Sequence, residues 1–177
     1  PTLNAKHAAL LRKQQVEVDK RDVLPIHHIP RLGCVYHESV PIIRNTKYEL
    51  LDKPWYVDVV AAGAVDLRDH KKKSGSNRYD EKKDYVDPKT GQLLQEKFEN
   101  DTLYKIRMIL ACAVMTRHET VLLGALGCGA FLNDPHVIAK LYKQALEEPE
   151  FKGKFKEVSF AVLGEPNYSI FKSALTI

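Results

Sequence analysis

The chain has 177 residues, 44% of them hydrophobic, and its 27 Lys and Arg against 23 Asp and Glu give a formal charge of +4. This length suits one domain with a sizeable core, and the hydrophobic content is too high for intrinsic disorder. No apolar run approaches the roughly 18 residues that a membrane helix needs, so we expect no membrane partner. The mild positive charge does not by itself indicate nucleic-acid binding.

The predicted elements alternate between strands and helices around one polar tract. Residues 66–100 mix both charges with Gly75 and Pro88, which is typical of a long, solvated loop or insertion. We therefore predict a single domain over residues 1–177 that carries a charged insertion at about 66–100. In chain order, the predicted elements are an extended Cys34–Ile43, a strand Val57–Ala62, a helix Leu103–Thr116, a buried strand Thr120–Leu126, a helix from Pro135 to about Glu148, a buried strand Val158–Leu163 and a helix Tyr168–Leu175. Helix-sized crossovers favour an α/β layered fold with parallel strands.

The segment Leu122–Tyr142 carries the clearest chemical signal. A buried strand runs into a glycine turn at its carboxyl end, which is where open α/β sheets place ligands. Gly127 and Gly129 can take positive φ and let backbone N–H groups approach an anion. Asn133 or Asp134 can cap the next helix, and Pro135 suits its first turn. The helix start would then present free N–H groups and a positive dipole end to a phosphate.

Two common phosphate-binding motifs do not match this loop. No Lys-Ser or Lys-Thr follows the glycines, which excludes a Walker loop. A dinucleotide fingerprint would need a third glycine where Leu132 stands, and the loop comes too late in the chain for a first βα unit. A purely structural turn with a good helix cap stays an alternative.

The string LGALGCGAFLNDPHVIAKLYKQAL, followed by FKEVSFAVL, resembles the microbial-type poly(ADP-ribose) glycohydrolase family of the macro domain superfamily. Members of that family look like VLGAWGCGAFGNDP at this position, with an F-x-x-V-x-F-A-I strand after the next helix. Upstream, CVYHESVPIIR and VDVVAAGA resemble two further family segments, so the likeness covers roughly residues 32–175. It implies a macro-domain-like α/β/α fold with a mixed or parallel sheet.

The resemblance also implies an ADP-ribose pocket. In such a pocket, the glycine turn is the loop that binds the diphosphate and the ribose. Residues at the strand end and at the helix cap support this loop, and the segment after the last strand closes over the adenosine. The implied loop residues are Gly127, Cys128, Gly129, Ala130 and Phe131, the supporting residues are Gly124, Ala125 and Asn133, and the adenosine-end residues are Asn167 and Phe171.

The catalytic motif of the family has no match in this chain. Catalytic members carry a Gly-Gly-Gly loop and a Gln-Glu-Glu motif, one glutamate of which protonates the leaving group. The segment Lys6–Gln15 falls where that helix would lie, but it offers Lys6, His7 and Ala8 in place of the acids. The string Gln95–Lys97 lacks the triple glycine. Either a longer parent protein supplies the missing strands and loop, or this is a shortened macro domain that binds without hydrolysing, and the catalytic residues are unknown.

The cysteines and histidines indicate neither a disulfide framework nor a metal site. The three cysteines lack C-x-x-C spacing, which favours a reducing compartment, the cytoplasm or the nucleus. Cys128 beside a helix start could have a depressed pKa, but no His-Asp pair supports it as a nucleophile. His27, His28 and His37 lack partners at ligand spacing. We expect no cofactor and no metal.

Aromatic and basic residues complete the set of candidates. We expect Trp55 to anchor a core. Tyr79 and Tyr85 could stack on bases if the tract bound nucleic acid, although interleaved acids favour a solvated loop. The basic residues concerned are Arg68, Lys71, Lys72, Lys73, Arg78, Lys82 and Lys83.

Two functions follow from these interpretations. The first is a macro-like domain, related to poly(ADP-ribose) glycohydrolases, that binds ADP-ribose or an ADP-ribosylated macromolecule. It could remove ADP-ribosyl groups only if an unusual residue or a missing segment supplied the acid. The second is a non-catalytic interaction or scaffold module with a vestigial glycine loop, which binds a protein or nucleic-acid partner through the charged insertion. The oligomeric state is open.

Overall fold

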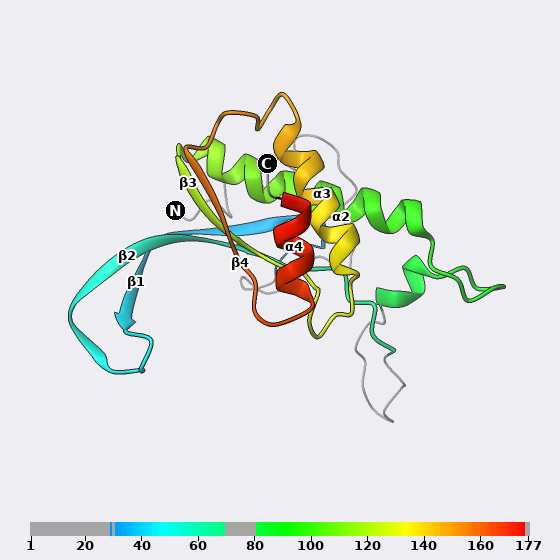
Figure 1. Ribbon diagram of the computed structural model, residues 1–177, viewed down its shortest axis with the longest axis horizontal. Coiled ribbons are helices and arrows are strands. Elements are labelled where there is room, and N and C mark those ends of the chain that lie inside the picture. The colour runs from blue at the N-terminus through cyan, green and yellow to red at the C-terminus, as the bar shows by residue number, and fades with distance from the viewer. Residues whose placement is uncertain (1–28, 30, 70–80, 176–177) are drawn as a thin grey trace. The chain divides into compact units, whose positions relative to one another are not determined.

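A computed structural model describes residue 29, residues 31–69 and residues 81–175 of the chain (Figure 1). The chain forms two compact units, Pro1–Gly63 and Ala64–Ile177, and each is described by itself. None of the helices in the described ranges is long and apolar enough to cross a membrane.

The first unit contains an antiparallel hairpin. Strand β1 (Cys34–Arg44) pairs with β2 (Leu50–Ala62), from the Cys34–Ala62 pair to the Arg44–Leu50 pair. The register shifts between His37 and Val40, where Ser39 takes a positive φ of 55° and donates its N–H to Asp58 Oδ1 at 2.8 Å. The prediction of strands here is confirmed, but β2 begins earlier than expected and the pair is antiparallel, because a short turn joins the two strands.

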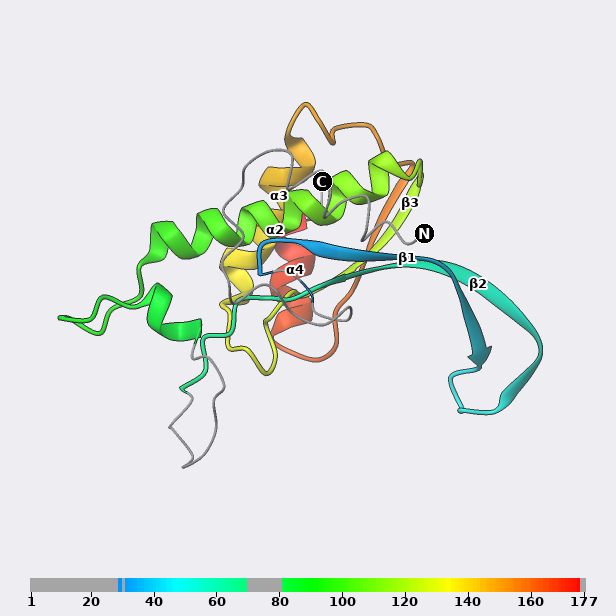
Figure 2. The same ribbon diagram turned by 180° about the vertical axis from the view of Figure 1, so that it is seen from behind.

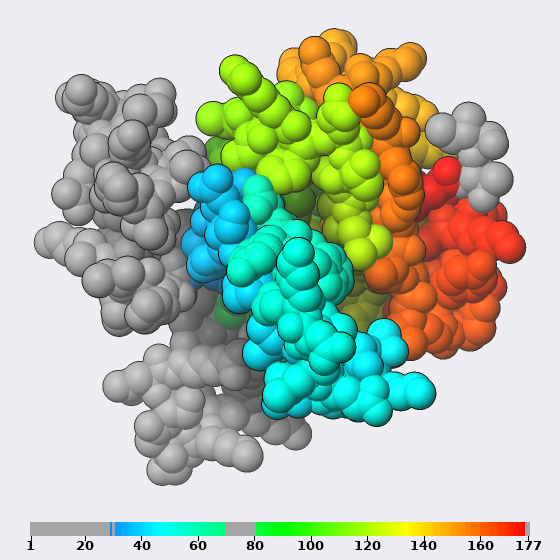
Figure 3. Space-filling view, turned by 90° about the vertical axis from the view of Figure 1, so that its left-hand side faces the viewer, coloured from blue at the N-terminus to red at the C-terminus, as the bar shows by residue number. Residues whose placement is uncertain are grey.

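The prediction that Trp55 anchors a core is wrong. Its side chain is 56% exposed on β2, opposite Ile42 of β1. The space-filling view shows atoms of this hairpin at the surface, in blue and cyan (Figure 3). A two-stranded hairpin buries a side chain only where a further layer covers one of its faces. The apolar character of Trp55 therefore does not identify a core position.

The second unit combines a parallel strand pair with helices. Its elements are η2 (Glu81–Tyr85), α2 (Gln95–Met115), β3 (Thr120–Gly124), α3 (Pro135–Glu147), β4 (Glu157–Ala161) and α4 (Asn167–Leu175). Strands β3 and β4 run parallel and in register from the Thr120–Glu157 pair to the Gly124–Ala161 pair. This confirms the predicted order of strand, helix, strand and helix. The described residues thus form a mixed α/β structure with two small sheets, while the three-layer arrangement stays a prediction.

The core of this unit lies between β3, β4 and the helices. Leu123 of β3 is buried, and Phe160 of β4 packs edge-on against Tyr142 of α3 with ring centroids 5.1 Å apart. Leu122, which points to the opposite face of β3, is 72% exposed, so the prediction of a fully buried strand was wrong for that face. Figure 2 shows α2 running across α3, and the Arg107 guanidinium of α2 joins Glu148 at the end of α3 at 2.6 Å.

The stretch predicted as a loop contains η2 and the first turns of α2. Helix α2 begins at Gln95 rather than at Leu103, and both Tyr85 and Phe98 are buried, with ring centroids 6.2 Å apart. A tight turn precedes the helix, because Gly91 at φ +72° donates its N–H to Asp87 O at 2.8 Å. Periodicity did not reveal this packing because the few apolar residues are scattered among charges.

Candidate functional site

The candidate site lies at the carboxyl ends of β3 and β4. Because the two strands are parallel, the glycine loop after β3 (residues 125–134) and the turn after β4 (residues 162–166) leave the sheet at the same edge. Asn167 Nδ2 donates to Cys128 O at 3.4 Å, which joins the start of α4 to this loop. The structure therefore brings together the predicted loop residues and one of the two adenosine-end candidates.

Gly127 occupies a position that only glycine fits. Its φ is +74°, and a Cβ there would lie 2.0 Å from Asn133 Nδ2 and 2.8 Å from Ala64 Cβ. The turn is closed by the Asn133 N–H, which donates to Gly127 O at 3.0 Å. Of the two glycines that can take positive φ, Gly127 does so and Gly129 does not. Leu132, at φ +62°, adopts the second left-handed conformation of the loop.

The start of α3 is already capped. Asp134 Oδ1 accepts the His136 N–H at 2.8 Å, Pro135 has no N–H, and the Ile138 N–H donates to Asp134 O at 3.0 Å. Asp134, not Asn133, is therefore the cap. The helix start therefore offers fewer donors to a phosphate than expected, because among its first residues only the Val137 N–H lacks a partner within the described part of the chain.

The loop itself carries the available donors. Within the described residues, the N–H groups of Gly129, Ala130 and Phe131 have no hydrogen-bond partner, and Gly129 and Ala130 are exposed. Flanking bonds hold the loop in shape, since Cys128 N donates to Ala125 O and Leu132 N donates to Gly129 O, each at 3.1 Å. Successive backbone N–H groups in a turn are suited to hold an anion.

Asn133 and Gly124 lie where supporting residues were expected. The Asn133 side chain is 3% exposed beneath Gly127, and neither its Nδ2 nor its Oδ1 has a partner among the described residues. Its buried amide therefore keeps hydrogen-bonding capacity for a water or a ligand atom. Gly124 pairs with Ala161 at the end of the strands, and a Cβ there would make an ordinary 3.7 Å contact with Ala161 O.

Cys128 is not an activated thiol. Burial raises its pKa to about 11, and the neighbouring Asp134 carboxylate adds to the shift. The Sγ atom lies 3.7 Å from Leu126 O, to which it donates. The depressed pKa that a helix start could produce is absent, because desolvation and a negative neighbour both oppose the thiolate.

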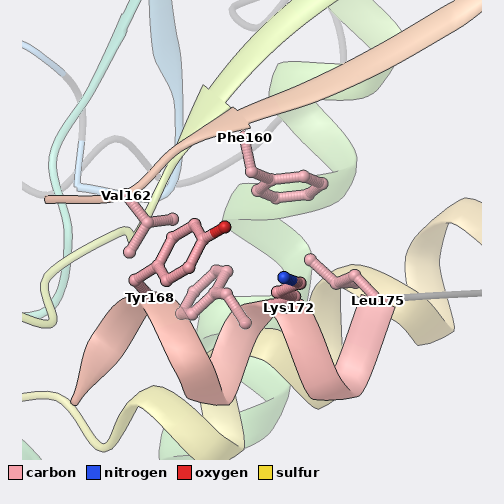
Figure 4. A pocket seen from close by; sticks show the side chains of 6 residues that line it. Phe160, Val162, Tyr168, Lys172 and Leu175 are labelled. Atoms are coloured by element: carbon pink, nitrogen blue, oxygen red, sulfur yellow. The ribbon is translucent and has the colours of Figure 1, made fainter. Parts of the chain in front are cut away.

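Of the two adenosine-end candidates, Phe171 is among the residues that line a surface hollow of about 220 Å³ (Figure 4), and Asn167 is not. Phe171 is 2% exposed and packs against Phe160 with ring centroids 5.9 Å apart, so little of its ring is accessible. Tyr168, one residue after Asn167, is 48% exposed and offers a more accessible ring. Sequence reasoning missed Tyr168. The hollow is lined by Phe160, Val162, Tyr168, Phe171, Lys172 and Leu175.

A second missed feature is the strap, defined as residues 64–68. Leu67 N donates to Phe131 O at 3.1 Å, and the Arg68 guanidinium carbon lies 4.8 Å from the centroid of the Phe131 ring. Asp66 Oδ1 and Oδ2 accept from Arg68 Nε and Nη2 at 2.8 and 2.6 Å. These residues lie at the start of the polar tract, and no local pattern indicates their contact with a loop far along the chain.

The described residues that were candidates for nucleic-acid binding are mostly buried or paired with other side chains. Tyr85 is fully buried and donates to Asp101 Oδ2 at 2.9 Å, so stacking of this ring on a base is excluded. Lys82 pairs with Asp69 at 2.7 Å. Gln95 begins α2 and donates to Glu99 at 2.6 Å. Seven candidate residues and one candidate segment lie outside the described residues: Lys71, Lys72, Lys73, Arg78, Tyr79, His27, His28 and Lys6–Gln15.

The metal candidates are equally isolated. His37 is exposed on β1. In the ranges that the structure describes, no three His, Cys, Asp or Glu side chains form a group that could hold a metal ion.

Comparison with known proteins gives structural relatives only. No family model matches the chain, and no curated protein matches its sequence. Among solved structures, poly(ADP-ribose) glycohydrolase from Deinococcus radiodurans in complex with ADP-ribose is 27% identical, with a TM-score of 0.60 over 80% of this chain and 52% of that one. This chain is structurally similar to bacterial poly(ADP-ribose) glycohydrolases.

Two further glycohydrolase structures agree with this relation. The apo form of the D. radiodurans enzyme gives a TM-score of 0.64 at the same coverage. The enzyme from Thermomonospora curvata is 23% identical, covers 97% of this chain and 53% of its own, and gives a TM-score of 0.63, which supports the fold. The chain spans about half the length of the glycohydrolases that it matches.

Proposed function

We propose that the second unit is an ADP-ribose-binding, macro-like domain related to poly(ADP-ribose) glycohydrolases. The observation that carries the proposal is the row of three unbonded N–H groups, at Gly129, Ala130 and Phe131, on a loop that follows a parallel strand. Such a row suits the oxygens of a diphosphate, and the relative from D. radiodurans is a complex with ADP-ribose. Gly127 and Asn133 keep the loop in this shape.

The adenosine half extends from the loop toward α4 in this proposal. Asn167 contacts the loop at Cys128 O, and the next residue, Tyr168, lines the hollow beside β4. An adenine can stack on an exposed aromatic ring there, and Lys172 lies near the same ring, 5.7 Å from its centroid. Phe171 supports this wall from beneath, as its burial indicates.

The proposal is one of binding, and hydrolysis would need more. Cleavage of a glycosidic bond requires a carboxylic acid that protonates the leaving oxygen. The resemblance implies that Lys6, His7 and Ala8 stand where the family has its glutamates, and none of these three side chains is a carboxylic acid. Release of ADP-ribose from ADP-ribosylated protein should therefore be assayed separately from binding.

Calorimetric titration of the whole chain with ADP-ribose, with AMP as a second ligand, tests the proposal. Gly129→Glu is the sharpest variant because a Cβ at Gly129 meets nothing within 4 Å and its φ is ordinary, so the loop can accept the side chain. The new carboxylate would repel a diphosphate at the amide row. Gln144→Glu, an exposed position on α3, makes the same change of charge elsewhere and is the control.

We expect micromolar binding of ADP-ribose by the wild type, preference over AMP, and a loss of at least tenfold in Gly129→Glu with none in Gln144→Glu. Circular dichroism melting checks that the variants fold. Unchanged affinity in Gly129→Glu would show that the anion binds elsewhere. A folded wild type that gives no heat with ADP-ribose would refute the proposal.

A further inference from the structure

The strap contacts the glycine loop at Gly127 and at Phe131. Ala64 lies against Gly127, Leu67 donates its N–H to Phe131 O, and Arg68 stacks over the Phe131 ring. Phe131 therefore joins the two features, because its N–H belongs to the unbonded row and its ring carries the guanidinium. The strap brings a cation to the edge of the candidate anion site.

The guanidinium of Arg68 has N–H donors that its pair with Asp66 does not use. Its pair with Asp66 uses the Nε hydrogen and one hydrogen of Nη2. Arg68 makes no other side-chain hydrogen bond within the described residues, so both hydrogens of Nη1 and one of Nη2 remain available. The side chain is 32% exposed, which leaves these donors accessible to a ligand.

The position of Arg68 is fixed before any ligand arrives. The Asp66 side chain is 10% exposed, and both of its carboxylate oxygens accept hydrogen bonds from the guanidinium. Asp66 Oδ1 also accepts the backbone N–H of Arg68 at 3.1 Å. The Asp66 N–H in turn donates to Glu81 Oε2 at 3.0 Å. The Phe131 ring restrains the flat face of the guanidinium. Because the side chain is already ordered, a ligand loses little free energy in ordering it.

We propose that Arg68 is a second ligand of the diphosphate, facing the backbone N–H groups of Gly129, Ala130 and Phe131, and that Asp66 is its positioning residue. This inference rests on the proposed function and deepens it. One phosphate of a diphosphate lies on the loop amides, and the other accepts hydrogen bonds from the guanidinium. The consequence is a preference for a nucleoside diphosphate group over a single phosphate.

The neighbouring charges set what this contact contributes. Asp66 offsets the charge of Arg68 within the strap, and directly after the strap Asp69 offsets the charge of Lys82. These residues together therefore add little net positive charge. Arg68 therefore acts through directed hydrogen bonds, for which the planar fork of arginine is better suited than the ammonium of lysine. Binding should depend only modestly on ionic strength.

Calorimetric titration of the full chain with ADP-ribose, ADP and AMP tests this role. Arg68→Gln should weaken ADP-ribose and ADP about tenfold and AMP by less than twofold, because the charge-assisted bonds to the second phosphate are lost. Arg68→Lys, which keeps the charge and loses the fork, should recover only part of that affinity. Lys82→Gln removes a cation paired nearby and should leave all three affinities unchanged.

The outcomes separate this inference from the function on which it rests. Thermal melting identifies any variant that fails to fold, and Arg68→Lys then replaces Arg68→Gln as the decisive variant. If the wild type binds ADP-ribose, Gly129→Glu abolishes it, and folded Arg68→Gln retains it within twofold, the role of Arg68 is refuted and the proposed function stands. Equal losses for AMP and ADP-ribose would also overturn it, because they would mean a general effect on the loop.

Discussion

Two regions of the second unit are held together in different ways. The first is the strand, loop and helix over residues 120–147, and the second is the strap together with η2. In the first, neighbours in the sequence make the contacts, since Asp134 caps the helix that Pro135 begins and Asn133 closes the turn at Gly127. In the second, the contacts are distant, as between Arg68 and Phe131. Local chemistry thus shapes the loop, and tertiary packing places the Arg68 side chain against it.

Truncation of Phe98 should do the most damage to the second region. Phe98 is 1% exposed and packs edge-on against Tyr85, at the end of η2. We expect Phe98→Ala to lower the free energy of unfolding by about 4 kcal/mol, because it leaves a large cavity. Leu94→Ala, at a side chain that is 39% exposed, is the control and should cost about 1 kcal/mol or less. Urea unfolding measures both, and equal small effects would mean that this stretch is a loop after all.

Gly127→Ala should be the most damaging change in the first region. The new Cβ would overlap Asn133 Nδ2 and press on Ala64, at a φ of +74°. We expect a loss of about 3 kcal/mol, which combines the clash with backbone strain. Gly153→Ala separates the two causes, because Gly153 has a φ of +72° but no atom near its Cβ position, and it should cost only about 1 kcal/mol. Equal losses would show that the close approach to Asn133 is unimportant.

The thiol of Cys128 should lose its proton at a higher pH than an ordinary cysteine thiol. Its pKa is raised from 9.0 to about 11, so its thiolate is scarcer than that of an ordinary thiol at any pH below 9. We expect alkylation of Cys128 to be about tenfold slower at pH 8 than in the unfolded chain, since greater intrinsic nucleophilicity offsets part of the deficit. The raised pKa stabilises the folded state below pH 9, and this contribution is lost as the pH rises toward 11.

The pH dependence of alkylation in a Cys34→Ser, Cys112→Ser background measures the Cys128 titration directly. A midpoint near 11 supports the burial described above. A midpoint below about 8 would instead indicate an activated thiol and would restore Cys128 as a nucleophile candidate.

Leu132→Gly should give the smallest effect, and it should be stabilising. Leu132 has a φ of +62° and is 65% exposed, so its side chain contributes little packing to offset the strained backbone. We expect a gain of about 1 kcal/mol in the free energy of unfolding. Arg117→Gly, at a φ of +61° after α2, is the matched comparison. A loss of stability in Leu132→Gly would show that the leucine side chain holds the loop.

Sequence reasoning predicted the parts of the fold that local rules determine. The bounds of α3 and the parallel pairing of β3 with β4 follow from a cap, a proline and two apolar strands separated by a helix. The start of α2 at Gln95 was missed because charged residues dominate its first turns. The hairpin pairing was missed because β2 begins seven residues before the apolar run at Val57.

The candidate site was only partly predictable for the same reason. The sequence predicts a positive φ at Gly127 from the residue itself, whereas Leu132 shows no such signal by itself and takes its left-handed conformation where the quoted family string has a glycine. The cap at Asp134 was among the alternatives, but its consequence, a helix start with few free donors, depends on bonds that the sequence does not display. Tyr168 lies beside β4 in the hollow that α4 helps to line, and Arg68 lies over the Phe131 ring. Tertiary packing makes both contacts, so only the folded chain reveals them.

The central claim is that the unbonded amides of the glycine loop hold a diphosphate. Titration of ¹⁵N-labelled protein with ADP-ribose, followed by amide chemical shifts, tests it most directly. We predict saturable shifts that are largest at Gly129, Ala130 and Phe131, with smaller ones at Asn167 and Tyr168. Saturable shifts confined to the hairpin Cys34–Ala62, or the absence of any shift in the loop at millimolar ADP-ribose, would contradict the account.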